Sequence, residues 1–277
     1  MLVTLNEVLK DAQAGKYGVG LFNTINMEMA RGVIAAAEEL KAPVIIGTAE
    51  VLLKFTPLDV LACELVLLAR NASVPVVLHF DHGLTKENIV KALKSGFTSV
   101  MYDCSTLPYE ENVAEVRKMA EFAHYYGATI EGELGHVGTN ADPDSETDVY
   151  TRPEEARDYA DRTQIDALAV AIGTAHGVYK EKPVLDIGRL KEIRSVVDTP
   201  LVLHGGSGLT AEDFRSCIRE GIAKVNIFTD INIAAAKASY DNYIEGKGYS
   251  LTIPKVVEAV KKVAEEKMKL FGSEGKG

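Results

Sequence analysis

Short apolar runs alternate with longer segments of helical periodicity along most of the chain. The runs are apolar without interruption, as at 43–47 (Pro-Val-Ile-Ile-Gly), which is typical of parallel strands buried on both faces. The segments between them place apolar residues three or four positions apart, as at 27–40, and this spacing predicts amphipathic helices. We expect strands at 18–23, 43–47, 75–79, 99–102, 128–134, 167–173, 200–204 and 224–228, and helices at 27–40, 57–69, 85–94, 108–126, 153–162, 187–196, 210–220, 230–243 and 254–270.

Eight strand–helix units of this kind favour a closed (β/α)8 barrel, the TIM barrel, of class α/β. The last predicted helix is additional to the eight units and would follow the barrel at the C-terminus. An open, doubly wound sheet is the alternative, because the strand and helix signals of the first two units are short. No linker or shift in composition divides the chain, so we expect a single domain over 1–277.

Composition and charge narrow the class of function. The formal net charge of −10 argues against nucleic acid or an anionic membrane as partner, since both require basic surfaces. An anionic substrate would need a local positive potential, from a metal, a helix N-terminus or a glycine-rich loop. Three distant cysteines (Cys63, Cys104 and Cys217) indicate reduced thiols, and neither a signal peptide nor a membrane span is evident. We therefore expect a soluble, cytoplasmic protein.

Three predicted strands end in a His-Gly pair, at His82, His176 and His204. The C-terminal ends of barrel strands meet at one rim, so these imidazoles are expected to converge there. Three neutral imidazoles with an open fourth position form a catalytic zinc site. A single histidine at a strand end is more often a hydrogen-bonded polar residue, but three in one arrangement favour the metal. His79 is interpreted as a core or supporting residue, and His124 as a helix-surface or packing residue.

Carboxylates accompany the histidines at two strand ends. Asp81 precedes His82, and either acts as a general acid and base or only orients a histidine. Glu133 ends an apolar strand (Glu-Gly-Glu-Leu-Gly at 131–135), where a carboxylate is costly unless it is paired or bound to metal. It is therefore either a further metal ligand or an anchor for one.

A glycine-rich loop (Gly205-Gly206-Ser207-Gly208) joins His204 to the helix predicted at 210–220. Thr210 and Asp213 have the spacing of a capping box, so the helix should begin there. Backbone N–H groups in such a loop can hold an oxyanion, and the last two strand–helix loops of these barrels commonly bind phosphate. Asn226 and Thr229 are polar donors at the end of the next strand. A tight turn without a ligand is the alternative.

Taken together, these motifs resemble the class II, zinc-dependent ketose-bisphosphate aldolases, the fructose- and tagatose-bisphosphate aldolase group. The resemblance spans nearly the whole chain, as far as the C-terminal segment 271–276 (Phe-Gly-Ser-Glu-Gly-Lys). The matching stretches are 77–83 (Val-Leu-His-Phe-Asp-His-Gly), 99–103 (Ser-Val-Met-Tyr-Asp), 131–135, 167–179, 201–208 and 224–229.

The resemblance implies a lyase of carbohydrate metabolism, in which zinc acts as a Lewis acid on a ketose phosphate. Asp81 would exchange a proton with the C4 hydroxyl, giving dihydroxyacetone phosphate and an aldehyde. The implied metal residues are His82, His176 and His204, with Glu133 and Asp103 at a possible second or displaced metal position. The implied substrate-binding residues are Asn23, Gly177, Gly205, Gly206, Ser207, Asn226 and Thr229. A sodium or potassium ion beside the phosphate and assembly into a homodimer or homotetramer are also typical of the family.

Two stretches depart from the family pattern. The loop after Gly135 lacks the usual Gly-Gly-acid-acid sequence, so Asp142, with Asp144 in reserve, is the candidate for the second proton-transfer carboxylate. No arginine lies near the start of the terminal helix, so Lys255 is the candidate for the distal phosphate, and an acceptor aldehyde other than glyceraldehyde 3-phosphate is the alternative. Alternatives are an aldolase for a sugar-acid or deoxy-sugar phosphate and a non-catalytic barrel subunit.

Overall fold

The computed structural model describes residues 1–138, 150–177 and 183–277. Nine parallel strands form one sheet: β1 (Leu2–Val3), β2 (Val19–Asn23), β3 (Val44–Ala49), β4 (Val76–Gly83), β5 (Ser99–Tyr102), β6 (Thr129–Leu134), β7 (Ala167–Val170), β8 (Leu201–Leu203) and β9 (Ile222–Ile227). Eight of them, β2 to β9, close into a barrel, because β9 pairs with β2 and every other neighbour pairs in sequence order. The TIM barrel is therefore confirmed, and the open sheet is excluded.

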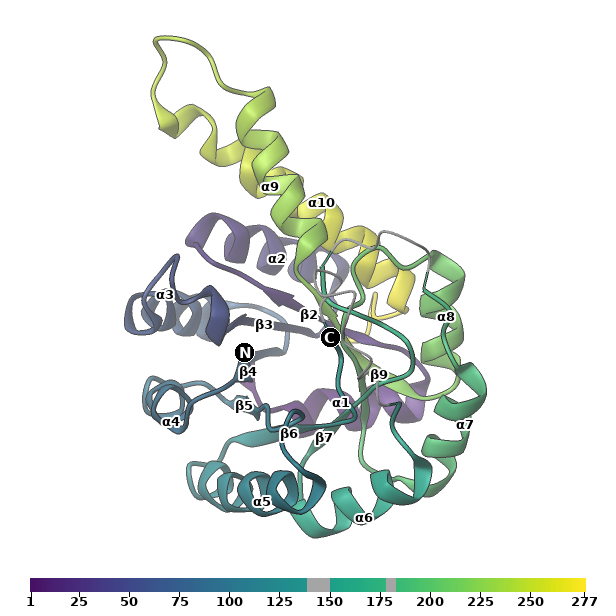
Figure 1. Cartoon of the computed structure of the whole chain (residues 1–277). Coiled ribbons are helices and arrows are strands. Elements are labelled where there is room, and N and C mark those ends of the chain that lie inside the picture. Colours follow the sequence, from purple (N-terminus) through teal and green to yellow (C-terminus); the bar gives the residue numbers. More distant parts are fainter. Residues whose placement is uncertain (139–149, 178–182) are drawn as a thin grey trace.

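Helices surround the barrel (Figure 1). They are α2 (Met27–Leu40), α3 (Leu58–Asn71), α4 (Lys86–Lys94), α5 (Tyr109–Tyr125), α6 (Pro153–Thr163), α7 (Ile187–Val196), α8 (Ala211–Arg219) and α9 (Thr229–Asp241), with the 3-10 turns η1 (Glu50–Leu52) and η2 (Tyr249–Leu251). The expected additional C-terminal helix is α10 (Ile253–Phe271), which packs against α2 and α9. Within the described ranges, no helix combines the length and apolar character needed to cross a bilayer.

Two elements before residue 18 were not expected from the sequence. The short β1 pairs with the start of β4, and α1 (Leu5–Gly15) follows it. Four buried side chains of α1 join a separate apolar cluster with residues from six barrel strands. They are Leu5, Val8, Leu9 and Ala12. Because these strand residues lie at the N-terminal half of the barrel, α1 closes the end opposite the predicted site.

Two helices extend beyond the barrel. The C-terminal part of α9, the connection that follows it and the start of α10 project away from the other elements as a helical hairpin (Figure 1). The rest of α10 returns along α2. The chain end is attached there by hydrogen bonds from the backbone N–H groups of Gly275 and Gly277 to the carbonyls of Leu40 and Lys41.

We predict that Leu9→Ala destabilises the fold by about 2–5 kcal/mol, because it leaves a cavity under the barrel that its neighbours cannot fill. Leu9 is fully buried in α1. Urea unfolding followed by circular dichroism measures the change. The control is Leu67→Ala on α3, where the side chain is 62% exposed and the expected change is within about 0.5 kcal/mol. Equal effects of the two substitutions would show that α1 does not close the core.

Candidate active site and metal centre

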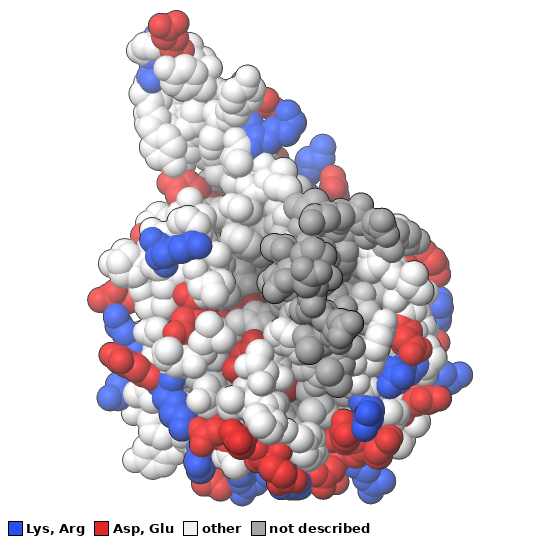
Figure 2. Space-filling model, viewed as in Figure 1, with Lys and Arg blue, Asp and Glu red and all other residues white. Residues whose placement is uncertain are grey.

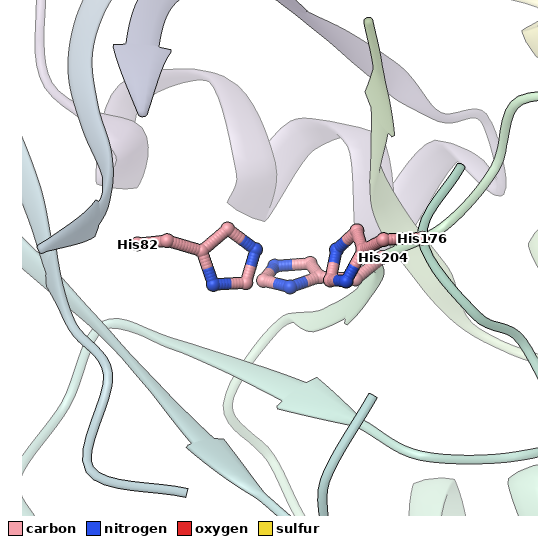
Figure 3. A group of neighbouring side chains, drawn as sticks. All are labelled: His82, His176 and His204. Carbon is pink, nitrogen blue, oxygen red and sulfur yellow. The ribbon is translucent and has the colours of Figure 1, made fainter. Parts of the chain in front are cut away.

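The three histidines converge at the C-terminal end of the barrel (Figure 3). His82 lies at the end of β4, and His176 and His204 follow β7 and β8. The ring centroid of His82 is 4.8 Å from that of His176 and 4.6 Å from that of His204. One ring nitrogen of each lies within 4.8 Å of the other two. The structure thus brings together residues that the sequence separates widely.

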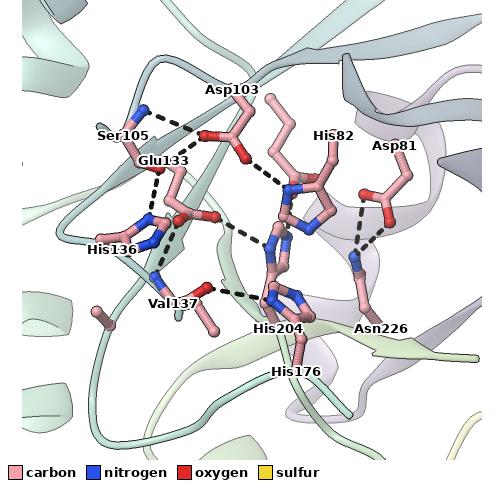
Figure 4. Close-up of polar contacts among 12 residues, drawn as sticks. Asp81, His82, Asp103, Ser105, Glu133, His136, Val137, His176, His204 and Asn226 are labelled. Atoms are coloured by element: carbon pink, nitrogen blue, oxygen red, sulfur yellow. Dashed lines mark hydrogen bonds and ion pairs between the residues drawn. The ribbon is translucent and has the colours of Figure 1, made fainter. Parts of the chain in front are cut away.

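One nitrogen of each ring is held by a neighbouring oxygen (Figure 4). The pairs are His82 Nδ1 with Asp103 Oδ2 at 2.7 Å, His204 Nε2 with Glu131 Oε1 at 2.7 Å, and His176 Nδ1 with the Val137 carbonyl oxygen at 3.1 Å. Partners of this kind fix the orientation and tautomer of histidines that bind metal. Each ring is therefore oriented before any ligand arrives.

The second nitrogen of each ring is buried without a hydrogen-bond partner among the described residues. These atoms are His82 Nε2, His176 Nε2 and His204 Nδ1. His204 Nδ1 also forms an ion pair with Glu133 Oε2 at 3.1 Å when the ring is protonated (Figure 4). Buried polar atoms without partners cost free energy, and here they face one another. The donor set fits a zinc ion, which takes three imidazoles and an open position in catalytic sites.

Backbone strain accompanies one of these histidines. His82 has a φ of +41°, in the left-handed region that residues other than glycine rarely adopt. Such strain is held in place by the surrounding structure and is concentrated at functional sites. The conformation turns the chain at the end of β4, so that Asp81 and His82 both line the same cavity.

Electrostatics differ between the rings. Burial disfavours the charged form of His204, but contacts with Glu131 and Glu133 outweigh burial and raise its pKa to about 10. Burial and the neighbouring His82 and His204 lower the pKa of His176 to about 3. In the metal-free protein at neutral pH, the His204 ring is therefore a charged imidazolium and the His176 ring is neutral.

Asp81 is buried beside the histidines and is held by two amides. Asn23 Nδ2 donates to its Oδ2 at 2.7 Å, and Asn226 Nδ2 lies 3.1 and 3.2 Å from its two oxygens. Burial alone would raise the pKa of Asp81, but His82, His79 Nε2 at 3.6 Å and the charge of Lys224 keep that pKa well below its usual value. Asp81 is therefore ionised and oriented.

A cavity of about 460 Å³ opens above these groups. None of the described residues that line it is a lysine or arginine, and the basic side chains in Figure 2 lie around the rim of this face. The lining includes seven of the implied substrate-binding residues: Asn23, Gly177, Gly205, Gly206, Ser207, Asn226 and Thr229. Gly205 has a φ of +65°, and a Cβ there would lie 2.4 Å from the Ala175 carbonyl oxygen, so only glycine fits.

The remaining predicted site residues do not all line the cavity. Asp103 and Glu133 form a second group with His82, whose ligand atoms also lie within 4.8 Å of one another. Lys255 is exposed at the start of α10 and does not line the cavity. Asp142 and Asp144 lie outside the described residues.

Some of the residues that support the histidines were expected from the sequence, and others were not. His79 is fully buried and shares a 2.6 Å hydrogen bond with Ser99, as befits the supporting role expected for it. Sequence reasoning missed Glu131, which contacts His204, and Lys224, which contacts Glu131. A lysine within the mostly apolar run 222–227 was the available signal for Lys224.

Comparison with known proteins agrees with this geometry. The family model for class-II fructose-bisphosphate aldolase matches residues 3–276. The chain belongs to the class-II fructose-bisphosphate aldolase family. This confirms the resemblance found in the sequence and places the chain among lyases, as expected.

Relatives in this aldolase family align along the full chain. A fructose-bisphosphate aldolase from Thermus caldophilus is 41% identical, with both chains fully covered. The uncharacterized protein YdjI of Escherichia coli K12 is 40% identical over 100% of this chain and 99% of that one. The crystal structure of the YdjI aldolase from Escherichia coli K12 superposes with a TM-score of 0.91, at 39% identity and over 100% of this chain and 99% of that one.

We predict that the zinc affinity of the metal-free protein rises with pH between 7 and 9. His204, with a pKa of about 10, must lose its proton before Nδ1 can bind metal, so affinity should rise about tenfold per pH unit for one proton released. Titration against a competing chelator measures the affinity. Calorimetry in buffers of different ionisation enthalpy counts the protons. An affinity that stays constant over this range would contradict the proton competition.

Proposed function

We propose that this protein is a zinc-dependent aldolase that reversibly cleaves a ketose 1-phosphate or ketose 1,6-bisphosphate. The products would be dihydroxyacetone phosphate and an aldehyde, as for fructose or tagatose bisphosphate. The observation that carries the proposal is the group of three imidazole nitrogens without hydrogen bonds, from His82, His176 and His204, beside an ionised, amide-held carboxylate. Family membership supports the same reaction class.

The metal-binding role falls to His82, His176 and His204, each through the ring nitrogen that makes no hydrogen bond among the described residues. When bound, zinc supplies a Lewis acid that polarises the ketose carbonyl and stabilises the charge that develops on cleavage. Asp103 orients the His82 ring and Glu131 orients the His204 ring, each through a hydrogen bond of 2.7 Å to the ring nitrogen that does not bind metal. Glu133 and Asp103, with His82, offer a second position for a metal.

Asp81 carries the proton. In cleavage it accepts the proton of the C4 hydroxyl as the C3–C4 bond breaks, and in condensation it returns that proton. Its low pKa keeps it in the accepting form. Asn23 and Asn226 fix the direction of its lone pairs, so the substrate hydroxyl meets an oriented base. Asp142 stays our candidate for the second proton transfer.

The substrate phosphate would be held by backbone N–H groups, since the described lining offers no lysine or arginine. The loop of Gly205, Gly206 and Ser207 leads to α8, and Thr229 begins α9, so two helix N-termini adjoin this part of the cavity. A sodium or potassium ion beside the phosphate would add the missing positive charge. Lys255 does not supply it within this chain, which favours a substrate with a single phosphate.

The assembly we propose is a homodimer or homotetramer joined through the projecting α9–α10 hairpin. Five large side chains of this hairpin are exposed by more than half: Tyr240, Tyr243, Ile244, Tyr249 and Leu251. Apolar clusters of this kind on a soluble protein mark surfaces that another chain covers.

The cytoplasm is the proposed location, since Cys63, Cys104 and Cys217 are free thiols.

We predict that the double substitution Tyr240→Ser with Tyr243→Ser shifts the protein toward the monomer. The two rings are 85% and 70% exposed in the isolated chain and would be buried by a second copy. Sedimentation velocity measures the mass. Tyr125→Ser on α5, where the ring is 86% exposed, is the matched control and should leave the mass unchanged. A monomeric parent protein would refute the proposed assembly.

The test of function is a condensation screen of the zinc-loaded protein with dihydroxyacetone phosphate and a panel of aldehydes. We expect turnover with at least one aldehyde, and loss of about 10²–10⁴-fold in kcat for Asp81→Asn, because the proton acceptor is gone. Zinc content, measured by mass spectrometry, should stay at about one ion per chain in that variant, since the three imidazoles remain.

Asp161→Asn on α6 is the control, because its side chain is 73% exposed and pairs only with Arg157 among the described residues. It should match the parent in turnover and zinc content. A protein that binds no metal, or a panel without any product, would refute the proposed aldolase. Unchanged turnover in Asp81→Asn would remove Asp81 from the mechanism.

A further inference from the structure

Lys224 places an ammonium group inside the barrel, where charged side chains are rarely found. The residue lies on β9 and is fully buried. Its Nζ is 2.8 Å from Glu131 Oε2 and donates to Asn226 Oδ1 at 2.8 Å. Removing an ammonium from water costs several kcal/mol, and apolar residues of similar volume are often the more stable choice at such positions. Stability alone therefore does not account for this lysine.

Glu131 connects the lysine to the metal centre. Its Oε1 accepts a hydrogen bond from His204 Nε2 at 2.7 Å, while its Oε2 faces Lys224. Both Glu131 and His204 are fully buried. The proton on Nε2 leaves Nδ1 of His204 as the nitrogen that can bind metal. The lysine therefore holds the carboxylate that fixes this tautomer.

Asn226 connects the same lysine to the proton-transfer group. An ammonium can only donate hydrogen bonds, so Asn226 must turn its Oδ1 toward Lys224. Its Nδ2 then faces Asp81, at 3.1 and 3.2 Å from the two oxygens. Without the lysine, the amide could rotate and set its oxygen against the carboxylate. The ammonium thus decides which end of the amide meets Asp81.

A bulge in β9 directs Lys224 to this place. Leu201 pairs with Ile222, and the next residue of β8, Val202, pairs with Lys224, so Ala223 is an additional residue in β9. Bulges change the direction of the side chains that follow and occur beside active sites. Lys224 and Asn226 are two residues apart beyond the bulge and both contact groups of the site.

We propose that Lys224 is a positioning residue that couples the two halves of the site, orienting His204 through Glu131 and Asp81 through Asn226. The inference rests on the proposed metal-dependent function. The inference goes beyond the proposed function, because Lys224 neither lines the cavity nor contacts the imidazole nitrogens that would bind metal. One buried charge would thereby set both the ligand geometry of the metal and the direction of the base.

The test is Lys224→Met, which keeps an unbranched side chain one atom shorter and removes the donor. We expect zinc affinity, measured by chelator competition, to fall about 10–100-fold, as for other partners of metal-binding histidines. The visible spectrum of the cobalt-substituted protein should change, because His204 is less well oriented. The kcat at saturating zinc should also fall. Lys237→Met on the exposed face of α9, where the lysine is 70% exposed, is the control and should change none of these.

A double variant keeps the test decisive if Lys224→Met does not fold. Lys224→Met with Glu131→Gln removes both members of the buried ion pair, leaving no isolated charge. We expect it to fold and to bind zinc about 10–100-fold more weakly than the parent. Zinc affinity and a cobalt spectrum equal to the parent's, in either folded variant, would overturn the inference. A parent protein that binds no zinc would overturn the proposed function and this inference together.

Discussion

The site depends on three imidazole nitrogens that face one another without a hydrogen-bond partner among the described residues. Each is carried by a separate strand end, so closure of the barrel is what brings them together. The opposite nitrogen of each ring is held by Asp103, Glu131 or the Val137 carbonyl, which prevents the rings from rotating to find other partners. The positive φ of His82 shows that the backbone is strained to complete this arrangement.

Charge balance follows from the same arrangement. Asp81, Glu131 and Glu133 are buried around the imidazoles, and Lys224 is the buried cation that contacts one of them. Lys224 offsets one of these carboxylates, and Asp103 beside His82 adds a further one, so with neutral histidines the centre has an excess of negative charge that favours a divalent ion. In the metal-free protein a proton on His204 supplies part of this charge, because contacts with Glu131 and Glu133 raise its pKa to about 10. Metal and proton therefore compete for one buried position.

Local sequence patterns predicted the barrel, because each strand is an apolar run and each helix has its own periodicity. The convergence of the three histidines could also be predicted, since topology alone places strand ends at one rim. The role expected for Asp81 and the single-domain organisation stay predictions. The start of the chain was missed, although Leu5, Val8, Leu9 and Ala12 have helical spacing, because α1 is short and adds no strand–helix unit.

The supporting contacts could not be predicted from the sequence, since they join distant positions. Glu131 and His204 are 73 residues apart, and Asn226 and Asp81 are 145 apart. Only the closed barrel shows that Lys224 lies between them. X-ray absorption spectroscopy at the zinc edge of the loaded protein tests the central claim most directly. The account predicts three imidazole nitrogens at about 2.0–2.1 Å from the ion. A spectrum with fewer imidazoles, or with sulfur, would contradict it.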